Sequence, residues 1–501
     1  MNTELLKKKI LDLAIRGKLV EQRPEEGTAE DLYLQIQEEK ANLIKEGKLK
    51  KEKPLAPIEN DDIPFDLPES WKWVRIRDIS LLVTKGTTPR GGNVAYTDKG
   101  VGFLRAENVN GLTTLNLSNL KFVSEKAHQN ELKRSVLEDG DILVTIAGTL
   151  GRTAVVQSTD LPLNANQAIS IVRMIFKSEN MLKYAAFALN ANTIQQILLR
   201  QTKQTAIPNL TLEIVGNCII PLPPLAEQKR IVEKIDLLFS KLHTVEDGLV
   251  EIDKLSDLTK KKILDLAIRG KLVKQRPEEC TAEDLYLQIQ EEKANLIKEG
   301  KLKKEKPLAP IENDDIPFDL PESWKWVRIR DISLLVTKGT TPRGGNVAYT
   351  DKGVGFLRAE NVNGLTTLNL SNLKFVSEKA HQNELKRSVL EDGDILVTIA
   401  GTLGRTAVVQ STDLPLNANQ AISIVRMIFK SENMLKYAAF ALNANTIQQI
   451  LLRQTKQTAI PNLTLEIVGN CIIPLPPLAE QKRIVAKVEE LLALCDKLKL
   501  K

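Results

Sequence analysis

The sequence predicts a mixed α+β fold, in which two α/β domains are separated by long antiparallel coiled-coil helices and related by a pseudo-two-fold axis. Three observations support this prediction. The chain repeats itself almost completely, each repeat combines helical and strand-like patterns, and a heptad pattern crosses the point where the repeats join. Because nearly identical sequences fold alike, the two halves should be equivalent units.

The repeat spans most of the chain. Residues 7–232 recur as residues 260–485, at an offset of 253, and only Glu21 and Gly27 are replaced, by Lys274 and Cys280. A chain of 501 residues is long enough for two units with their own cores. We therefore expect a helical region at 1–58, a globular domain at 59–224, a helical spacer at 225–311, a second globular domain at 312–477 and a terminal helix at 478–501.

The segment from Leu225 to Val273 carries apolar residues at alternating spacings of four and three, which is typical of a coiled-coil seam. A helix of some forty residues would be roughly 60 Å long, so we interpret it as a spacer. Both chain ends repeat its pattern, and we expect them to pack antiparallel on it, which would relate the copies by a dyad. The predicted seam consists of Ile231, Ile235, Leu238, Leu242, Val245, Leu249 and Ile252, with Ile484, Val488, Leu491 and Leu498 at the carboxyl end.

Each copy begins with helices. Thr3–Arg16 is amphipathic and Gly17 is placed to end it, and a capping-box pattern at Thr28 predicts a second helix to about Lys45. From Leu67 onward, β-branched runs broken by Gly, Pro and Asn predict strands. These runs are 73–79, 141–146, 153–156 and 168–173; helical spacing returns at 180–200, and the prolines after residue 219 are expected to end the globule.

Composition narrows the class of protein. The net charge of +6 and the pI of about 8.8 permit nucleic-acid binding. The four cysteines show no disulfide or CxxC spacing, and we find no signal peptide or long apolar run. A reducing cytoplasm is therefore the expected location.

Motifs of catalysis are missing from the sequence. It has no Asn/Asp-Pro-Pro-aromatic tetrapeptide, no Gly-rich nucleotide-binding turn and no Walker lysine, since the residues from Gly148 to Arg152 lack the Gly-Lys-Ser/Thr ending. His128, His243 and His381 are isolated, and His243 is interpreted as a surface residue and not a metal ligand. We therefore expect a binding protein without catalytic residues, metal or bound cofactor.

Four segments together resemble the specificity subunit of type I restriction-modification systems. They are Leu67-Pro-Glu-Ser-Trp-Lys-Trp-Val, the Glu138-Asp-Gly-Asp-Ile-Leu-Val-Thr-Ile-Ala-Gly-Thr-Leu-Gly run, Ile207-Pro-Asn-Leu, and Ile219-Ile-Pro-Leu-Pro-Pro-Leu-Ala-Glu-Gln-Lys-Arg-Ile-Val. All four recur in the second copy, so the resemblance covers nearly the whole chain.

The resemblance implies a non-catalytic DNA-binding subunit with two target recognition domains, each reading half of a bipartite site. Its helices would set the spacer and dock two methyltransferase subunits. S-adenosylmethionine, ATP and Mg would be bound by partners, which include two restriction/translocase subunits. Members of this family usually carry two different recognition domains, whereas these copies are the same. Identical readers related by a dyad would read inverted half-sites, so we expect an interrupted palindrome.

Loops rich in Lys, Arg, Asn and Gln are the candidates for contacting DNA, because phosphates attract cations and base edges need directional donors and acceptors. Three clusters fit, at 85–93, 148–152 and 200–209, with 105–110 as a further candidate. The predicted DNA-binding residues are Lys85, Thr87, Arg90, Asn93, Arg105, Asn108, Arg152, Gln201, Lys203, Gln204 and Asn209, and in the second copy Lys338, Thr340, Arg343, Asn346, Arg358, Asn361, Arg405, Gln454, Lys456, Gln457 and Asn462.

Two other classes of protein remain open at this point. One is a coiled-coil scaffold carrying two protein-binding globules, because heptads and mixed α/β units have no DNA signature of their own. The other is a fused restriction enzyme, which the missing methyltransferase and nuclease motifs disfavour. DNA affinity that falls steeply with salt would separate the first alternative from a DNA-recognition subunit.

Overall fold

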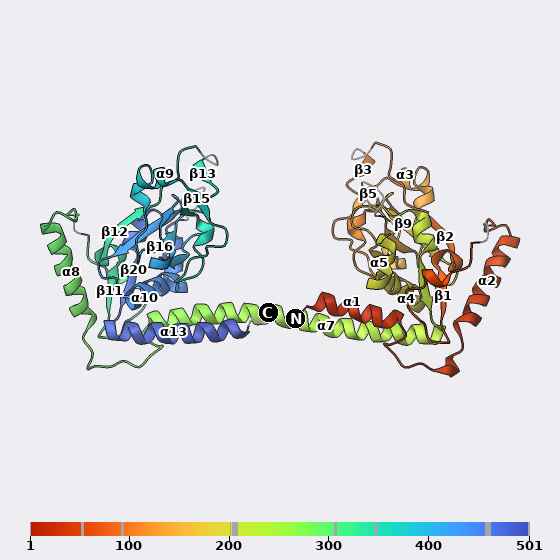
Figure 1. Cartoon of the computed structure of the whole chain (residues 1–501), viewed down its shortest axis with the longest axis horizontal. Helices are drawn as coiled ribbons and strands as arrows, with labels where there is room; N and C mark the ends of the chain where they lie inside the picture. Colours follow the sequence, from red (N-terminus) through yellow and green to blue (C-terminus); the bar gives the residue numbers. More distant parts are fainter. Residues whose placement is uncertain are drawn as a thin grey trace. The chain divides into compact units, whose positions relative to one another are not determined.

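A computed structural model describes residues 2–51, 55–91, 95–200, 202, 209–304, 308–344, 348–455 and 462–498 (Figure 1). The chain divides into two compact units, Met1–Asp247 and Gly248–Lys501. Both contain helices and small sheets, which confirms the predicted mixed α+β class. In the described ranges, every helix is too short or too polar to cross a membrane.

The first unit contains two four-stranded sheets and one two-stranded sheet. The strand orders are β2-β9-β6-β7, which is antiparallel throughout, and β3-β5-β4-β8, in which β4 and β8 are parallel; β1 pairs with β10. The strands are β1 (Lys72–Arg75), β2 (Ser80–Lys85), β3 (Tyr96–Thr97), β4 (Val101–Leu104), β5 (Lys121–Val123), β6 (Ile142–Thr145), β7 (Thr153–Val155), β8 (Leu163–Ala165), β9 (Ile169–Met174) and β10 (Ile219–Leu222).

The helices of the first unit share a core with its sheets. Ile15, Ile36, Val144, Phe187 and Ile231 are all buried in one cluster, so the amino-terminal helices and the start of the long helix are built into the globule. The helices are α1 (Thr3–Ile15), α2 (Ala29–Lys45), α3 (Glu125–Gln129), α4 (Glu179–Asn190), α5 (Asn192–Arg200), α6 (Leu212–Asn217) and α7 (Leu225–Ile268), of which α7 continues into the second unit.

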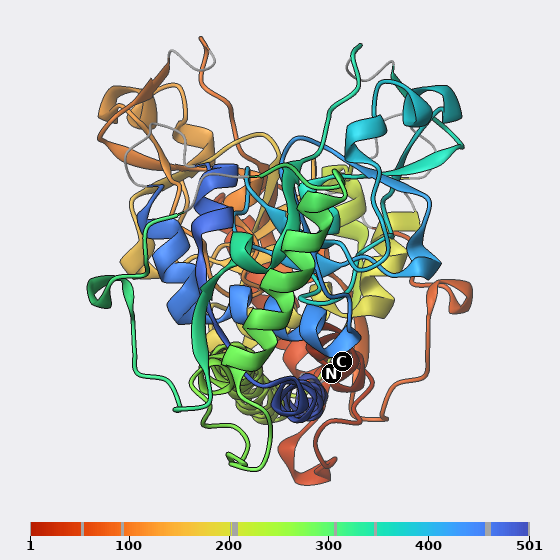
Figure 2. The ribbon, with the colours of Figure 1, turned by 90° about the vertical axis from the view of Figure 1, so that its left-hand side faces the viewer.

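The second unit repeats this architecture element by element, with the same strand orders. Figure 2 shows α8 running in front of the second globule. Its elements are α8 (Ala282–Lys298), β11 (Lys325–Arg328), β12 (Ser333–Lys338), β13 (Tyr349–Thr350), β14 (Val354–Leu357), β15 (Lys374–Val376), α9 (Glu378–Gln382), β16 (Ile395–Thr398), β17 (Thr406–Val408), β18 (Leu416–Ala418), β19 (Ile422–Met427), α10 (Glu432–Asn443), α11 (Asn445–Arg453), α12 (Leu465–Asn470), β20 (Ile472–Leu475) and α13 (Leu478–Leu498).

Several local predictions are confirmed. The side chain of Thr28 accepts a hydrogen bond from the backbone of Asp31, forming the capping box that begins α2. Gly17 follows the end of α1 with φ of +66°, a conformation that favours glycine. The backbone therefore turns where the sequence indicates.

Other local predictions are wrong. The predicted strand at 73–79 continues beyond Arg75 as a short 3-10 helix, Ile76–Ile79. The single helix expected at 180–200 is interrupted at Ala191, which separates α4 from α5. Pro221 lies inside β10 instead of ending the sheet, because β10 belongs to a two-stranded ribbon, where a missing N–H is tolerated.

In each unit a helix from one end of the repeat lies antiparallel to one from the other end. In the first unit Lys7 of α1 forms an ion pair with Glu246 of α7 at 3.0 Å, whereas Glu26, later in the chain, pairs with Arg230, which is earlier in α7 (Figure 1). In the second unit the hydroxyl of Ser256 donates to the carbonyl of Cys495 at 3.1 Å. The expected packing of the terminal helices on the central helix is thus present in both units.

The predicted seam is only partly buried. Val245 is 40% exposed, and its neighbour Glu246 is the residue of α7 that pairs with Lys7 of α1. Ile252 and Leu498 lie where the helix pair of the second unit ends, at 37% and 60% exposure. The seam prediction is wrong at these three positions. Ile231, Ile235, Ile484 and Val488 are buried, and Leu238, Leu242, Leu249 and Leu491 are half-buried.

Candidate nucleic-acid interface

The loop after β2 is held against the turn that joins β8 and β9. The backbone N–H of Gly86 donates to the carbonyl of Ile169 and that of Thr87 to the carbonyl of Ala165, both at 2.9 Å. A β-carbon at residue 86 would lie 2.1 Å from the carbonyl oxygen of Asn166, so only glycine permits this approach. Lys85 and Arg90, on either side of this anchor, are exposed.

A second segment completes this polar end of the sheet. The carboxylate of Glu131 accepts a hydrogen bond from the backbone N–H of Arg90 at 2.6 Å, and the guanidinium of Arg134 donates to the hydroxyl of Thr87 at 3.4 Å. Lys85, Arg90 and Arg134 thus form an exposed basic cluster, which we call the β2-loop cluster. The sequence prediction did not include Arg134, although its neighbour Lys133 gave a weak signal of basic charge.

Two predicted residues have structural contacts instead. Asn108 is 2% exposed; its side chain accepts from the backbone of Arg105 and donates to the carbonyl of Asn116, both at 2.8 Å. Arg105 pairs with Glu107. Asn361 is equally buried, and Arg358 pairs with Glu360. The prediction that Asn108 and Asn361 contact DNA is wrong, because their amides close the short turn after β4 and β14.

Arg152 opens onto a cavity of the first unit with a volume of about 760 Å³. Its backbone N–H donates to the hydroxyl of Thr145 at 2.9 Å, and the preceding Gly151 packs so closely on Gln195 of α5 that a β-carbon would lie 2.4 Å from the amide. This Arg152 cavity is lined by polar groups from loops, α1 and α5, among them Lys7, Lys8, Asn110, Asn192, Gln195 and Gln196.

Sequence reasoning did not place α1 at this cavity. Hydrogen bonding to Glu246 raises the pKa of Lys7, so Lys7 keeps its positive charge. The carboxylate of Glu246 offsets that charge. Lys8 and Arg152 are exposed and carry positive charge into the cavity. Only the folded unit brings Lys8 and Arg152 together, because they lie 144 positions apart in the chain.

Several predicted residues lie outside the described ranges, namely Asn93, Gln201, Lys203, Gln204, Asn346, Lys456 and Gln457. Of the same loops, Asn209, Gln454 and Asn462 are described and exposed. Leu210, which follows Asn209, donates its N–H to the carbonyl of Ile146 at 3.0 Å. This hydrogen bond fixes the end of the 200–209 loop beside β6.

The second globule presents the same groups in the same arrangement. Thr340 donates its backbone N–H to Ala418 at 2.9 Å and accepts from Arg387 at 3.4 Å, and Glu384 accepts from the backbone of Arg343 at 2.7 Å. Lys338 and Arg405 are exposed, as Lys85 and Arg152 are. Each unit therefore offers the same candidate contacts.

Within the described residues, no group of three His, Cys, Asp or Glu side chains could hold a metal ion. Burial raises the pKa of Cys218 and of Cys471 to about 12, so neither is a thiolate near neutral pH. His128 lies with its Nδ1 2.5 Å from the amide oxygen of Asn164, a contact within the fold.

A buried carboxylate joins each globule to its helix pair. Glu227, 2% exposed at the start of α7, accepts hydrogen bonds from the indole of Trp71 at 2.8 Å and the amide of Gln22 at 2.5 Å. Burial raises the pKa of Glu227 despite these two donors. Glu480 repeats the contacts with Trp324 at 2.9 Å and Gln275 at 2.6 Å. This junction sets where the globule sits on its helices.

The helix pairs also expose apolar side chains. Leu5 and Leu237 are 63% and 49% exposed in the first unit, and exposed apolar residues are frequent on the helices of the second. Apolar surface of this kind often marks a site of protein association. The exposed set, which we call the helix patch of each unit, includes Leu5, Leu6, Leu225, Leu237 and Val245 in the first unit and Val250, Ile252, Leu255, Leu258, Leu478, Leu494 and Leu498 in the second.

Comparison with known proteins gives consistent matches. A sequence model described as the Type I restriction modification DNA specificity domain matches residues 68–252 and 321–500. The chain is 28% identical to the EcoEI and 27% identical to the EcoAI type I restriction enzyme specificity subunits of Escherichia coli, in each case over 99% of this chain and 90% of the relative. A chain solved in work on assembly and conformational transition of the type I R-M system superposes with a TM-score of 0.58 at 21% identity, covering 87% of this chain and 93% of that one, a likeness of fold.

Proposed function

Because the chain belongs to the family of type I restriction-modification specificity subunits, we propose that its two globules read the two halves of a bipartite DNA target. The observation that carries this proposal is the pair of β2-loop clusters. In both globules an anchored loop presents the same exposed Lys and Arg beside a second Arg. Arginine and lysine suit phosphate contacts, and arginine can also read guanine.

The two half-sites are proposed to be inverted copies of one sequence. The described residues of the two globules form the same contacts, so they should prefer the same bases. If a dyad relates the globules, each reads the opposite strand, and the target is an interrupted palindrome. The helices between the globules would then set the length of the gap.

Methyltransferase subunits are proposed to dock on the helix patch. The patch of the first unit exposes Leu5 and that of the second unit exposes Leu258, and exposed leucines on a helix suit packing against a partner protein. Under this proposal, partners supply S-adenosylmethionine, ATP and Mg, and two restriction/translocase subunits complete the cleaving complex. This chain supplies recognition only.

A salt titration tests DNA binding. The full chain, reconstituted with its methyltransferase subunits, is titrated into a fluorescent duplex at increasing salt, and the logarithm of affinity should fall linearly with that of salt concentration. Replacing Lys85, Arg90, Lys338 and Arg343 with Ala should flatten the slope. Replacing the exposed Lys121 and Lys374, in β5 and β15, is the matched control. Affinity that does not respond to salt would favour the scaffold alternative.

A further inference from the structure

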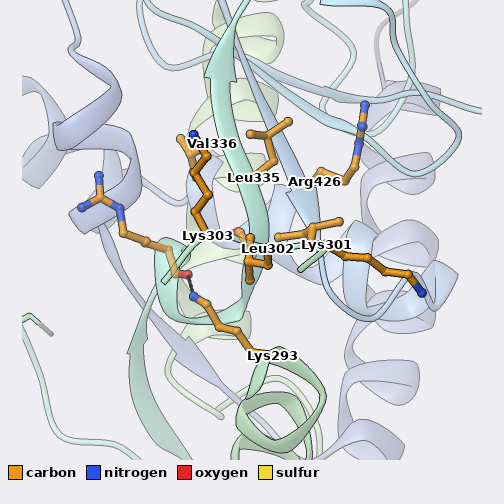
Figure 3. A pocket seen from close by; sticks show the side chains of 10 residues that line it. Lys293, Lys301, Leu302, Lys303, Leu335, Val336 and Arg426 are labelled. Atoms are coloured by element: carbon orange, nitrogen blue, oxygen red, sulfur yellow. Dashed lines mark hydrogen bonds between the residues drawn. The ribbon is translucent and has the colours of Figure 1, made fainter. Parts of the chain in front are cut away.

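A groove with basic walls lies beside β12 in the second unit, with a volume of about 380 Å³. Lys293 of α8, Lys301 and Lys303 border it, and Leu302, Leu335 and Val336 contribute apolar surface (Figure 3). The first unit has a smaller groove at the equivalent position, with a volume of about 40 Å³. Its lining includes Lys40, Lys50 and Leu82. We call both copies the edge groove.

The groove follows the outer edge of a sheet. β12 is the first strand in the order β12-β19-β16-β17, and among the described strands its only partner is β19. A β-bulge between Ser333 and Leu335 interrupts that pairing beside the groove. An edge strand offers backbone N–H and C=O groups to an additional strand, which is a common way of binding extended peptides.

The charge of the lining favours an acidic ligand. Each charged residue that lines either groove is Lys or Arg. Three of these cations have partners within the fold, since Lys293 donates to the carbonyl of Arg330 at 2.9 Å, Lys301 pairs with Glu299 at 2.7 Å and Arg426 pairs with Asp394 at 2.7 Å. Lys303 and its counterpart Lys50 are exposed, so they keep their charge at the rim.

Apolar exposure at the same place favours a peptide over a phosphate backbone. Leu335 is 39% exposed and its counterpart Leu82 is 40% exposed. Figure 3 shows Leu335 and Val336 pointing to opposite sides of the strand, as alternate residues do. The phosphate backbone of a nucleic acid makes no favourable apolar contact with an exposed leucine. A peptide with alternating acidic and apolar residues can pair with the lysines and also pack on the leucine.

We infer that the edge groove binds an extended acidic peptide segment of another protein, which adds a strand to β12 or to its counterpart β2. The groove is lined by Ser80–Val83 and Ser333–Val336, and it does not include Lys85, Arg90 or Arg134 of the β2-loop cluster, or Arg152. Peptide binding is therefore independent of the proposed DNA target, and either can fail without the other.

The test uses the full chain and a fluorescent peptide of about eight residues, which spans a typical strand, with Glu and Val alternating. Binding is followed by anisotropy, and hydrogen exchange measured by mass spectrometry locates the contact. We expect protection of 333–336 and 80–83, the parts of β12 and β2 that line the groove. The double variant Lys50→Glu and Lys303→Glu should weaken binding by roughly tenfold or more, because both rim charges are reversed.

Three controls make the result decisive. Lys121→Glu with Lys374→Glu reverses two exposed charges elsewhere and should leave peptide affinity unchanged. A peptide alternating Lys and Val, and a Glu-Val peptide interrupted by Pro, should both bind poorly, because the first has the wrong charge and the second cannot continue a ladder. Equal binding of the Lys peptide, or protection of the same strands by duplex DNA and not by the acidic peptide, would overturn the inference.

Discussion

The two units have almost the same sequence, yet they differ where one glycine becomes a cysteine. Gly27 has φ of +81° and follows the short 3-10 helix Pro24–Glu26, whereas Cys280 does not adopt a positive φ. Next to them, Glu26 makes two hydrogen bonds with Arg230, at 2.9 and 2.5 Å, while Glu279 contacts Arg483 through one oxygen and leaves the other buried and unpartnered.

Some contacts are the same in both units, whereas this turn differs between them. The junctions at Glu227 and Glu480 and the loop anchors at Thr87 and Thr340 are the same in both units, within 0.1 Å for the hydrogen bonds to tryptophan. The turn at residues 27 and 280 has diverged. The junctions and the loop anchors are therefore the contacts that both units share, and the turn is the place where they differ.

The largest effect is expected at the junction. Trp71→Ala should destabilise the first unit by about 3–5 kcal/mol, because it removes a buried indole, its edge contact with Tyr184 and the hydrogen bond to Glu227. Trp324→Ala should cost the second unit the same amount. Hydrogen exchange in denaturant, read separately for each unit, measures the loss of unfolding free energy in both variants. A loss in only one of the two units would show that the junctions are not equivalent.

The next largest effect, on DNA affinity, is expected from replacing Arg152 or its counterpart Arg405. If both globules read identical half-sites, Arg152→Ala and Arg405→Ala should each reduce target affinity by about 1–3 kcal/mol, and by equal amounts. Competition binding of the reconstituted complex gives the two values. Unequal losses would contradict the inverted arrangement, and Lys121→Ala serves as a surface control.

The ion pair of the first unit should show a pH dependence. Hydrogen bonding from Arg230 lowers the pKa of Glu26, so its stabilisation is present above the ordinary value of 4.5 and is lost as the pH falls through the lowered pKa. Glu26→Gln should cost about 1 kcal/mol at pH 7 and nothing in strong acid. Glu279→Gln, with fewer bonds to lose, should cost less; equal costs would remove the distinction between the units.

The smallest effect is expected from exchanging the turn residues. Gly27→Cys would strain a positive φ by about 1–2 kcal/mol if the turn stayed fixed. Because the second unit shows a turn that cysteine can adopt, we expect relaxation to that form and a cost below about 1 kcal/mol. Urea unfolding of the variant, with Cys280→Gly as the reverse exchange, measures this. A cost of about 1–2 kcal/mol would mean that the first turn does not relax.

Much of the fold could be predicted from sequence, because it is encoded locally. The capping box at Thr28, the glycine stop at Gly17 and the repeat itself are visible in the residues. The break at Ala191 and the inclusion of Pro221 in a strand were not predictable, because both depend on packing partners distant in the chain.

The candidate interface was less predictable. Arg90 and Arg152 were found from loop composition, but the roles of Arg134 and Lys8 depend on folding, which brings them beside Thr87 and Arg152. Asn108 was misassigned because an exposed reader and a buried turn-closing amide have the same sequence pattern. Heptad spacing likewise indicates which side chains share a face but not where the partner helix ends, as at Ile252.

The central claim is that identical globules read one half-site in two inverted copies. Mapping methylated adenines across the genome of cells that express this chain with its methyltransferase subunits tests it most directly. We expect one motif that is the same on both strands, interrupted by a gap of constant length. Two different half-sites on either side of the gap would contradict it.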